Sequence, residues 1–172
     1  MILWLNGAFG VGKTTTAQAI RKAAPAWRLF DPEHVGLLLA ANLAGVEFND
    51  FQDLPPWRSL VPLIASELSD FTGDDLLVVQ TVMVRDYWEE MRTRFSERQQ
   101  KVVHVVLDAP AAALESRIKA DQVERSAEQW RLDHVSSYET ARSWLLPAAD
   151  LVVDTDVLSA ADAATYILQS VT

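Results

Sequence analysis

The sequence feature that most restricts the fold is a glycine-rich stretch near the beginning, GAFGVGKT at residues 7–14. It matches the pattern G-x-x-x-x-G-K-[ST] at every fixed position. An apolar run at residues 2–5 precedes it. Residues 14–24 follow with apolar side chains at helical spacing, and Pro25 ends the pattern. A strand, a loop and a helix in this order are typical of an α/β domain that holds a phosphate group at the loop.

Each residue type in this stretch has a physical reason. Glycine lets backbone N–H groups approach a polyphosphate without a clash from Cβ, and the helix start adds partial positive charge. Lys13 is expected to reach the β- and γ-phosphates, and the Thr14 hydroxyl to ligate Mg²⁺. A chance glycine-rich turn ending in Lys-Thr, the alternative, does not account for the flanking strand and helix. We therefore expect ATP with Mg²⁺ to bind at Gly7, Ala8, Phe9, Gly10, Val11, Gly12, Lys13, Thr14 and Thr15.

Beyond the loop, apolar β-type runs alternate with helical patterns. Strands are expected at residues 27–30, 76–79, 101–108 and 150–154, and helices at 86–99, from 111, and after a capping box of Ser159 and Asp162. This order predicts an α/β, three-layer P-loop NTPase fold like that of nucleoside and shikimate kinases. It has a five-stranded parallel sheet with helices on both faces, in a single domain over residues 1–172. Two segments exceed what a crossover needs: residues 31–74, expected to bind an acceptor, and residues 119–143, expected to form a lid.

Composition narrows the function classes. The chain has no cysteine, which excludes disulfides, thiolate metal sites and thiol nucleophiles. Its net charge of −9 disfavours a nucleic-acid partner. Its apolar runs fall short of the roughly 18 residues that cross a bilayer, so we expect no integral membrane segment. The N-terminus lacks a basic leader, so we expect a cytoplasmic protein. The three histidines, His34, His104 and His134, have no spacing that suggests a metal site or a catalytic triad, so we expect structural roles for them.

Several classes of nucleotide-binding protein do not fit. The chain carries neither the N-K-x-D guanine reader nor the D-x-x-G switch of a GTPase. It is also too short for the oligomerising helical domain of a motor ATPase. A small kinase fits best, with ATP at the loop, an acceptor in the insertion and arginines in the lid.

Two roles remain open for Asp31, which follows the second expected strand. At the carboxyl edge of a parallel sheet it would lie beside the phosphate loop, where it could take the proton of an acceptor hydroxyl. It is also well placed to cap a helix that begins with Pro32. In the block FQDLPPWR, Asp53 is a further candidate acceptor contact. Trp57 lies on an apolar stripe that favours the core, whereas Arg58 points about 100° away, either into a cleft or into solvent.

The magnesium side and the lid supply the remaining candidates. Asp108 resembles a Walker B aspartate, but its place before APAAALESRI favours a helix cap. Gln80 and Thr81, after the third expected strand, could hold a magnesium-bound water. Closing arginines stabilise phosphoryl transfer, so Arg117 and Arg125 are candidates, with salt-bridged surface arginines as the alternative.

Four blocks of the sequence together resemble the bacterial ATP-binding tunicamycin-resistance proteins: WLNGAFGVGKTTTA, DPEHVG, FQDLPPWR and LLVVQTVMVRDYW. The resemblance covers roughly the first 95 residues well and the rest loosely. It implies a P-loop fold similar to nucleoside kinases, ATP binding at Gly7 to Thr14, and protection against a nucleoside antibiotic. It also implies that Asp31, Asp53, Trp57 and Arg58 face the acceptor.

Three functions follow as hypotheses. The first is an ATP-dependent kinase of a small hydroxylated molecule, with tunicamycin as the candidate acceptor. The second is a protein that sequesters the antibiotic without chemistry, and the third is a metabolic small-molecule kinase. The six tryptophans leave open a core, a homodimer interface or an aromatic ligand shelf, with Trp130 and Trp144 near the lid.

Overall fold

The computed structural model describes residues 1–123 and 125–171. In this part of the chain, five strands form one sheet in which every neighbouring pair runs parallel. The order is β2-β3-β1-β4-β5. The strands are β1 Ile2–Gly7, β2 Arg28–Phe30, β3 Leu76–Val79, β4 Val102–Asp108 and β5 Leu151–Asp154. The expected five-stranded parallel sheet is confirmed, and β1 with its phosphate loop lies at its centre.

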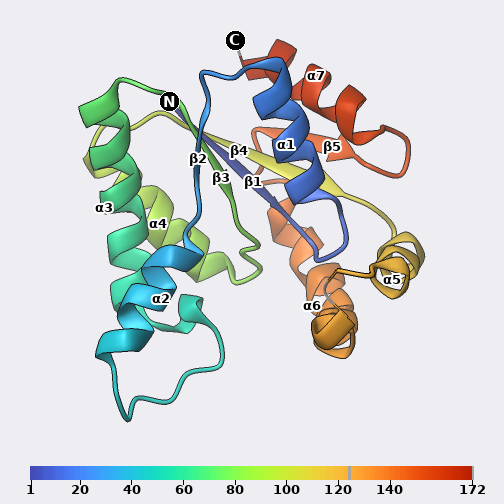
Figure 1. Cartoon of the computed structure of the whole chain (residues 1–172), viewed down its shortest axis with the longest axis horizontal. Coiled ribbons are helices and arrows are strands. Elements are labelled where there is room, and N and C mark those ends of the chain that lie inside the picture. The colour runs from blue at the N-terminus through green and yellow to red at the C-terminus, as the bar shows by residue number, and fades with distance from the viewer. Residues whose placement is uncertain (124, 172) are drawn as a thin grey trace.

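Helices cover both faces of this sheet, which confirms the three-layer fold (Figure 1). Helices α3 and α4 pack together on one face, and α1 and α7 pack together on the other. At the carboxyl ends of the strands, α2 projects on one side and α5 with α6 on the other. The helices are α1 Lys13–Ala23, α2 Glu33–Asn42, α3 Pro55–Thr72, α4 Arg85–Glu97, α5 Ala111–Ala120, α6 Glu128–Leu145 and α7 Ala160–Val171, with 3₁₀ turns η1 Phe51–Asp53 and η2 Arg125–Ala127.

The alternation of side chains along β1 divides the core in two. Ile2 and Trp4 point to the face under α3 and α4, whereas Leu3 and Leu5 point to the face under α1 and α7. All four are fully buried. Burial of large side chains on both faces of the central strand stabilises the sheet through the hydrophobic effect and fixes its register.

The structure defines where the strands and helices end, which the sequence pattern left approximate. Strand β1 continues past Leu5 to Gly7, because Asn6 and Gly7 pair with Val106 and Leu107 of β4. At the start of α7, the Asp162 N–H donates to Ser159 Oγ at 3.2 Å, as expected for a cap. No helix in the described residues is long and apolar enough to cross a membrane.

The expectation that Asp108 caps a helix is wrong. Helix α5 begins only at Ala111, and Pro110 before it is extended, so Asp108 lies too far from the first turn. Its carboxylate instead accepts hydrogen bonds from Tyr138 Oη at 2.7 Å and Arg142 Nη2 at 2.8 Å. Asp108 therefore ties the end of β4 to helix α6.

Candidate functional site

The phosphate loop, residues 7–14, takes a shape that requires glycine. Gly7, Gly10 and Gly12 all have positive φ, at +136°, +78° and +95°. A Cβ at Gly7 would collide with the Leu107 carbonyl oxygen, and one at Gly10 would lie 2.8 Å from Ile118 Cγ1. The loop thus packs against β4 and α5 so closely that side chains at these positions have no room.

The loop and the start of α1 suit an anion. The first turn of α1 contains no acidic residue, so the partial positive charge of the helix is not neutralised there. Lys13 Nζ donates to the carbonyl oxygens of Gly7 at 3.0 Å and Ala8 at 2.7 Å, which holds its ammonium group over the loop. The side chains of Thr14 and Thr15 are exposed beside it. A triphosphate fits this cradle, and the Thr14 hydroxyl is a ligand of the hard, oxygen-binding kind that Mg²⁺ prefers.

A buried polar network supports the loop from below. Asn6 Oδ1 accepts from the N–H groups of Gly7 and Val82, each at 2.8 Å, and Asn6 Nδ2 donates to Val82 O at 3.1 Å. Asn6 Nδ2 also lies 3.2 Å from His104 Nε2, while His104 Nδ1 lies 3.2 Å from Ala148 O. Because a carbonyl can only accept, the Nδ1 atom of His104 carries the proton and Nε2 accepts from Asn6. Asn6 was not identified from sequence, because a lone asparagine at a strand end has no distinctive pattern.

Burial lowers the pKa of His104 to about 4, against a smaller opposing effect of its hydrogen bond to Ala148. The imidazole is therefore neutral at pH 7, which its role as acceptor from Asn6 requires. His104 thus has the structural role that we expected for it.

Thr81, in the loop that follows β3, and Gln52, in η1, join the network. Thr81 is buried, and its Oγ1 donates to Gly7 O at 2.9 Å. Gln52 Nε2 donates to Thr81 O at 2.9 Å, and Trp144 Nε1 donates to Met83 O at 3.2 Å. The segment after β3 is thus bound to the phosphate loop, to η1 and to α6. A role of Thr81 with magnesium stays a prediction.

Asp31 lies half-buried where β2 ends, on the same edge of the sheet as the phosphate loop. Its Oδ1 accepts from the Glu33 N–H at 2.9 Å, so it caps the first turn of α2. Within the described residues, Oδ2 accepts no hydrogen bond from the protein. One oxygen thus has a structural partner and the other is available for a ligand.

Residues 31–58 of the predicted acceptor-binding insertion, called the acceptor wall below, are held by side chains of distant elements. Arg58 Nε donates to Glu90 Oε2 of α4 at 2.6 Å, and Nη1 donates to Gln52 O. Its guanidinium lies 4.2 Å from the Tyr87 ring centroid. Arg58 is buried, so the solvent-exposed alternative is wrong. The sequence left both alternatives open because α4, which supplies Glu90 and Tyr87, is distant in sequence.

Trp57 and Asp53 have different surroundings on the same wall. Trp57 is fully buried, as its apolar stripe indicated, and its Nε1 donates to Pro32 O at 3.1 Å. Asp53 Oδ2 accepts from the Asp50 N–H at 3.1 Å in a reciprocal capping box that begins η1. Tyr87 Oη donates to Asp53 Oδ1 at 3.3 Å. Direct contact of these residues with an acceptor stays a prediction.

The two predicted lid arginines lie in different settings. Arg117 on α5 donates to Thr155 Oγ1 at 3.1 Å and Thr155 O at 2.8 Å, and approaches Asp156 at 3.6 Å. It therefore packs against the segment after β5. Arg125 begins η2 and is exposed, with one hydrogen bond to Gln122. Of the two, Arg125 has the guanidinium that is less constrained by the protein.

The predicted lid, residues 119–143, meets the phosphate loop through an aromatic cluster of Phe9, Trp130 and His134. The Phe9 ring lies 4.8 Å from Trp130 and 5.7 Å from His134 between centroids, and the Trp130 and His134 rings are 4.1 Å apart. The two contacts of Phe9 join residues more than a hundred positions apart. A tryptophan and a histidine four residues apart on one helix were the only signal in the sequence.

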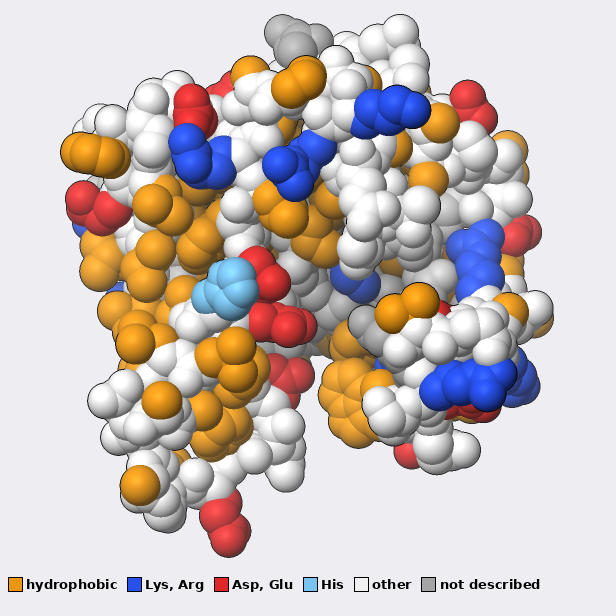
Figure 2. Space-filling view, in the orientation of Figure 1, with side chains coloured by type: hydrophobic (Ala, Val, Ile, Leu, Met, Phe, Trp, Pro, Cys, Tyr) orange, Lys and Arg blue, Asp and Glu red, His pale blue; other side chains and the backbone are white. Residues whose placement is uncertain are grey.

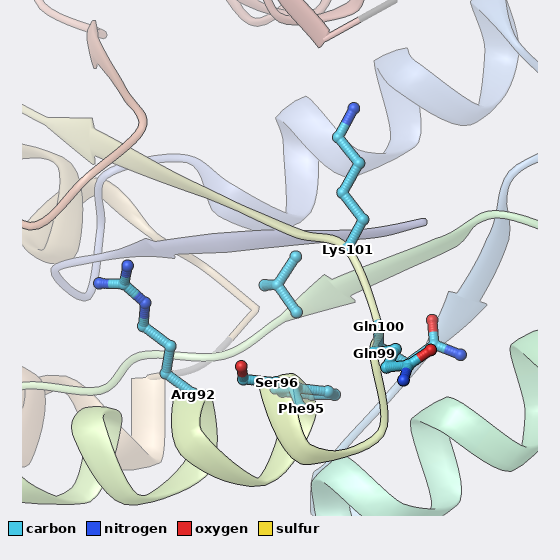
Figure 3. Close-up of a pocket in the computed structure, with 7 residues that line it drawn as sticks. Arg92, Phe95, Ser96, Gln99, Gln100 and Lys101 are labelled. Atoms are coloured by element: carbon cyan, nitrogen blue, oxygen red, sulfur yellow. The ribbon is translucent and has the colours of Figure 1, made fainter.

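Figure 2 shows a hollow between the α2 side and the α5–α6 side, at the carboxyl end of the sheet. Acidic side chains gather on its α2 side, and hydrophobic ones line the opposite lip. A second hollow of about 310 Å³ lies between the end of α4 and the start of β4, lined by Arg92, Phe95 and Lys101 among others (Figure 3). Because it adjoins the amino end of β4, it is distant from the phosphate loop.

Comparison with known proteins identifies the type of domain. A family model described as an AAA domain matches residues 2–142. No curated protein matches the sequence at a significant level. Among solved structures, the tunicamycin resistance protein of Deinococcus radiodurans is similar, with a TM-score of 0.74 and 24% identity over 99% of this chain and 94% of that chain.

Two solved kinases share the fold. The shikimate kinase of Bacteroides thetaiotaomicron has a TM-score of 0.64 and 16% identity, over 98% of this chain and 97% of that chain. The APS kinase of Mycobacterium tuberculosis, in complex with AMPPNP and APS, has a TM-score of 0.66 and 16% identity, over 98% of this chain and 95% of that one. At these identities the likeness shows the fold, a P-loop kinase-like domain.

Proposed function

The chain belongs to the AAA-domain family whose model spans residues 2–142, and on that premise we propose that it is an ATP-dependent phosphotransferase. Its acceptor is a small hydroxylated molecule, with tunicamycin as the leading candidate. The observation that carries this proposal is the pairing of a phosphate loop with Asp31. The two lie on one edge of the sheet, and one oxygen of that carboxylate is available.

In the proposed reaction, Mg-ATP supplies the γ-phosphoryl group and the divalent charge that neutralises it. The backbone of residues 7–15 and Lys13 bind the triphosphate, and Thr14 holds the metal. Asp31 Oδ2 takes the proton of the acceptor hydroxyl while the hydroxyl oxygen bonds to the γ-phosphorus. The bond from the γ-phosphorus to the bridging oxygen breaks, and ADP leaves. Arg117 and Arg125 are the proposed cations that stabilise the transferred group when the lid, residues 119–143, closes. Since the reaction consumes ATP, we place it in the cytoplasm.

Tunicamycin as the acceptor is supported by the four sequence blocks and by the similarity to the Deinococcus radiodurans protein. Asp53, Trp57 and Arg58 belong to the wall that would surround it. Arg58 and Trp57 act there by holding the wall in place, because both are buried.

The experiment that tests the proposal incubates the protein with Mg-ATP and tunicamycin and then determines the mass of the drug. We expect the mass of one phosphoryl group to be added, and Lys13→Ala to abolish the addition by removing the charge at the β- and γ-phosphates. An unmodified drug after complete incubation would contradict the proposed reaction with this acceptor. The same assay with sugars and shikimate would then identify a metabolic acceptor.

Asp31→Asn separates catalysis from structure. Asparagine keeps an oxygen that accepts from the Glu33 N–H, so the start of α2 should remain folded. We expect turnover to fall by about 10²- to 10⁴-fold while ATP affinity is unchanged, because general-base catalysis contributes that much. Glu47→Gln, a change of an exposed carboxylate on the same wall, is the matched control. Equal turnover in both variants would remove Asp31 from the role of base.

One observation favours a second function, binding of the antibiotic without chemistry. The two residues after β3, Gln80 and Thr81, include no carboxylate to support magnesium. A sequestering protein would protect in proportion to its own amount and leave the drug unmodified. Titration of drug activity against protein concentration distinguishes the two, because a kinase protects far beyond a ratio of one.

A further inference from the structure

Helix α6 presents two rows of side chains. One row is buried in the domain and includes Val135, Tyr138 and Leu145. The other row is displaced by one residue and consists of Trp130 and His134, which are four positions apart and therefore on one side of the helix. This second row meets Phe9 of the phosphate loop rather than the main core.

The aromatic cluster keeps much of its surface open. All six tryptophans are described, and Trp130 alone among them is exposed, at 45%. Trp4, Trp57 and Trp88 are almost completely buried. A tryptophan that contacts two other rings and still leaves nearly half of its surface open offers a further planar group a place to stack.

His134 adds a polar edge to the cluster. Its Nδ1 lies 2.6 Å from Trp130 O, and because a carbonyl only accepts, Nδ1 carries a proton. Within the described part of the chain, Nε2 has no hydrogen-bond partner. In the neutral ring this nitrogen is an acceptor for an N–H or O–H group of a ligand.

The position of the cluster indicates that its ligand is the acceptor rather than ATP. Lys13 Nζ lies 5.4 Å from the Phe9 ring centroid. In a phosphate loop this lysine contacts the β- and γ-phosphates, the end of ATP farthest from adenine. A ring that stacks on Phe9 and Trp130 is therefore beside the γ-phosphate, where an acceptor binds. Across the hollow, acidic side chains on the α2 side offer acceptors for sugar hydroxyls (Figure 2).

From these contacts we infer that the aromatic cluster binds the planar base of a nucleoside-type acceptor, whose sugar hydroxyls face Asp31. The site thus combines a surface for stacking with carboxylates for hydroxyl groups, which is the chemistry of a nucleoside. The assignment of this ligand as an acceptor rests on the proposed function, whereas the binding of a base by the cluster does not.

The test measures binding to the full chain by calorimetry in the presence of Mg-AMPPNP. The probes are uridine, guanosine and tunicamycin, with ribose as the comparison that lacks a base. We expect Trp130→Ala to weaken binding of at least one base-containing probe by about tenfold or more, since stacking on an aromatic side chain contributes that much. Trp130→Phe should retain most of the affinity, and ribose should bind both variants alike. Ser137→Ala, an exposed change on the same helix, is the matched control.

Three results would overturn the inference: no base-containing probe binds, all bind Trp130→Ala as they bind the unchanged chain, or the variant weakens only Mg-AMPPNP. The last result would assign the cluster to the donor nucleotide. Failure of the proposed function is a separate outcome, namely base binding that depends on Trp130 without phosphoryl transfer. Thermal unfolding of each variant, with Trp130→Phe as the folded reference, shows that a loss of binding is not a loss of fold.

Discussion

In the phosphate loop the backbone itself determines the shape, whereas the acceptor wall is shaped by side chains from distant elements. Gly7 and Gly10 hold conformations that other residues rarely adopt, within a single stretch of eight residues. The wall depends on Arg58, Glu90 and Gln52, which come from three different segments. The loop depends on its own glycines and on the backbone packed against them, whereas the assembled wall weakens when any of its side-chain partners changes.

The substitution expected to disturb the phosphate loop most is Gly7→Ala. The new Cβ would collide with Leu107 O at a φ of +136°, so strain and overpacking act together. We expect unfolding free energy to fall by about 4 kcal/mol, together with loss of ATP binding. Gly12→Ala is the matched control, because φ there is +95° but nothing lies within 4 Å of the added Cβ. It should cost about 1–2 kcal/mol in urea unfolding. Equal losses would mean that packing against β4 does not shape the loop.

The network beneath the loop predicts a pH dependence. Burial lowers the pKa of His104 from 6.5 to about 4, so the unfolded chain binds a proton there more readily than the folded one. The contribution of neutral His104 to the free energy of unfolding is complete above pH 6.5. It is lost as the pH falls from 6.5 toward 4, by up to about 3 kcal/mol. Denaturant unfolding at several pH values measures this slope, and His104→Gln should flatten it. The exposed His34→Gln should leave it unchanged, and a slope that survives in His104→Gln would contradict the assignment.

The assembled wall is tested by Arg58→Met, which keeps the bulk of the side chain without its charge. It removes the hydrogen bonds to Glu90 and Gln52 and the contact with Tyr87. We expect a loss of about 2 kcal/mol, less than for a fully buried pair because Glu90 is 31% exposed. In a double-mutant cycle with Glu90→Gln, a coupling near zero would show that the pair does not support the wall.

The same pair has an acid dependence of its own. Burial alone would raise the pKa of Glu90, but hydrogen bonds from Arg58 and Arg94 outweigh it and lower the pKa below 4.5. The folded state therefore gains stability from Glu90 above its ordinary pKa and loses it as the pH falls through the lowered value. Arg58→Met should reduce this acid-induced loss below pH 4.5, and the control Arg85→Met, in an exposed pair with Glu89, should not.

The smallest expected effect is at the capping box of η1. Asp50 accepts from the Gln52 N–H at 2.9 Å, and Asp50→Ala should cost about 1 kcal/mol, as measured by thermal unfolding. Glu47→Ala removes an equal charge from the same wall without touching the box. If Asp50→Ala also weakens acceptor binding but leaves ATP binding unchanged, the capping box supports the wall and not the loop.

Features that lie within a short stretch of the chain could be predicted from the sequence, whereas features that join distant segments could not. The loop, the five strands and the three-layer fold follow from patterns within short stretches, such as GAFGVGKT and KVVHVVLD, and the structure confirms them. The wrong interpretation of Asp108 and the open alternatives for Arg58 have a common cause. Each residue has a partner on a helix that is distant in sequence, Arg142 in one case and Glu90 in the other. The contact between Phe9 and Trp130 was out of reach for the same reason.

The strand order also has a consequence for how such a protein diversifies. Because β1 is central, the acceptor wall is carried by β2 and β3, and the lid by β4 and β5, on opposite sides of the loop. Each half of the sheet bears one side of the hollow, and Gln52 on one side and Trp144 of α6 on the other both donate hydrogen bonds to the segment after β3. Substitutions can therefore change one side of the hollow for a new ligand while the other side and the phosphate loop between them stay the same.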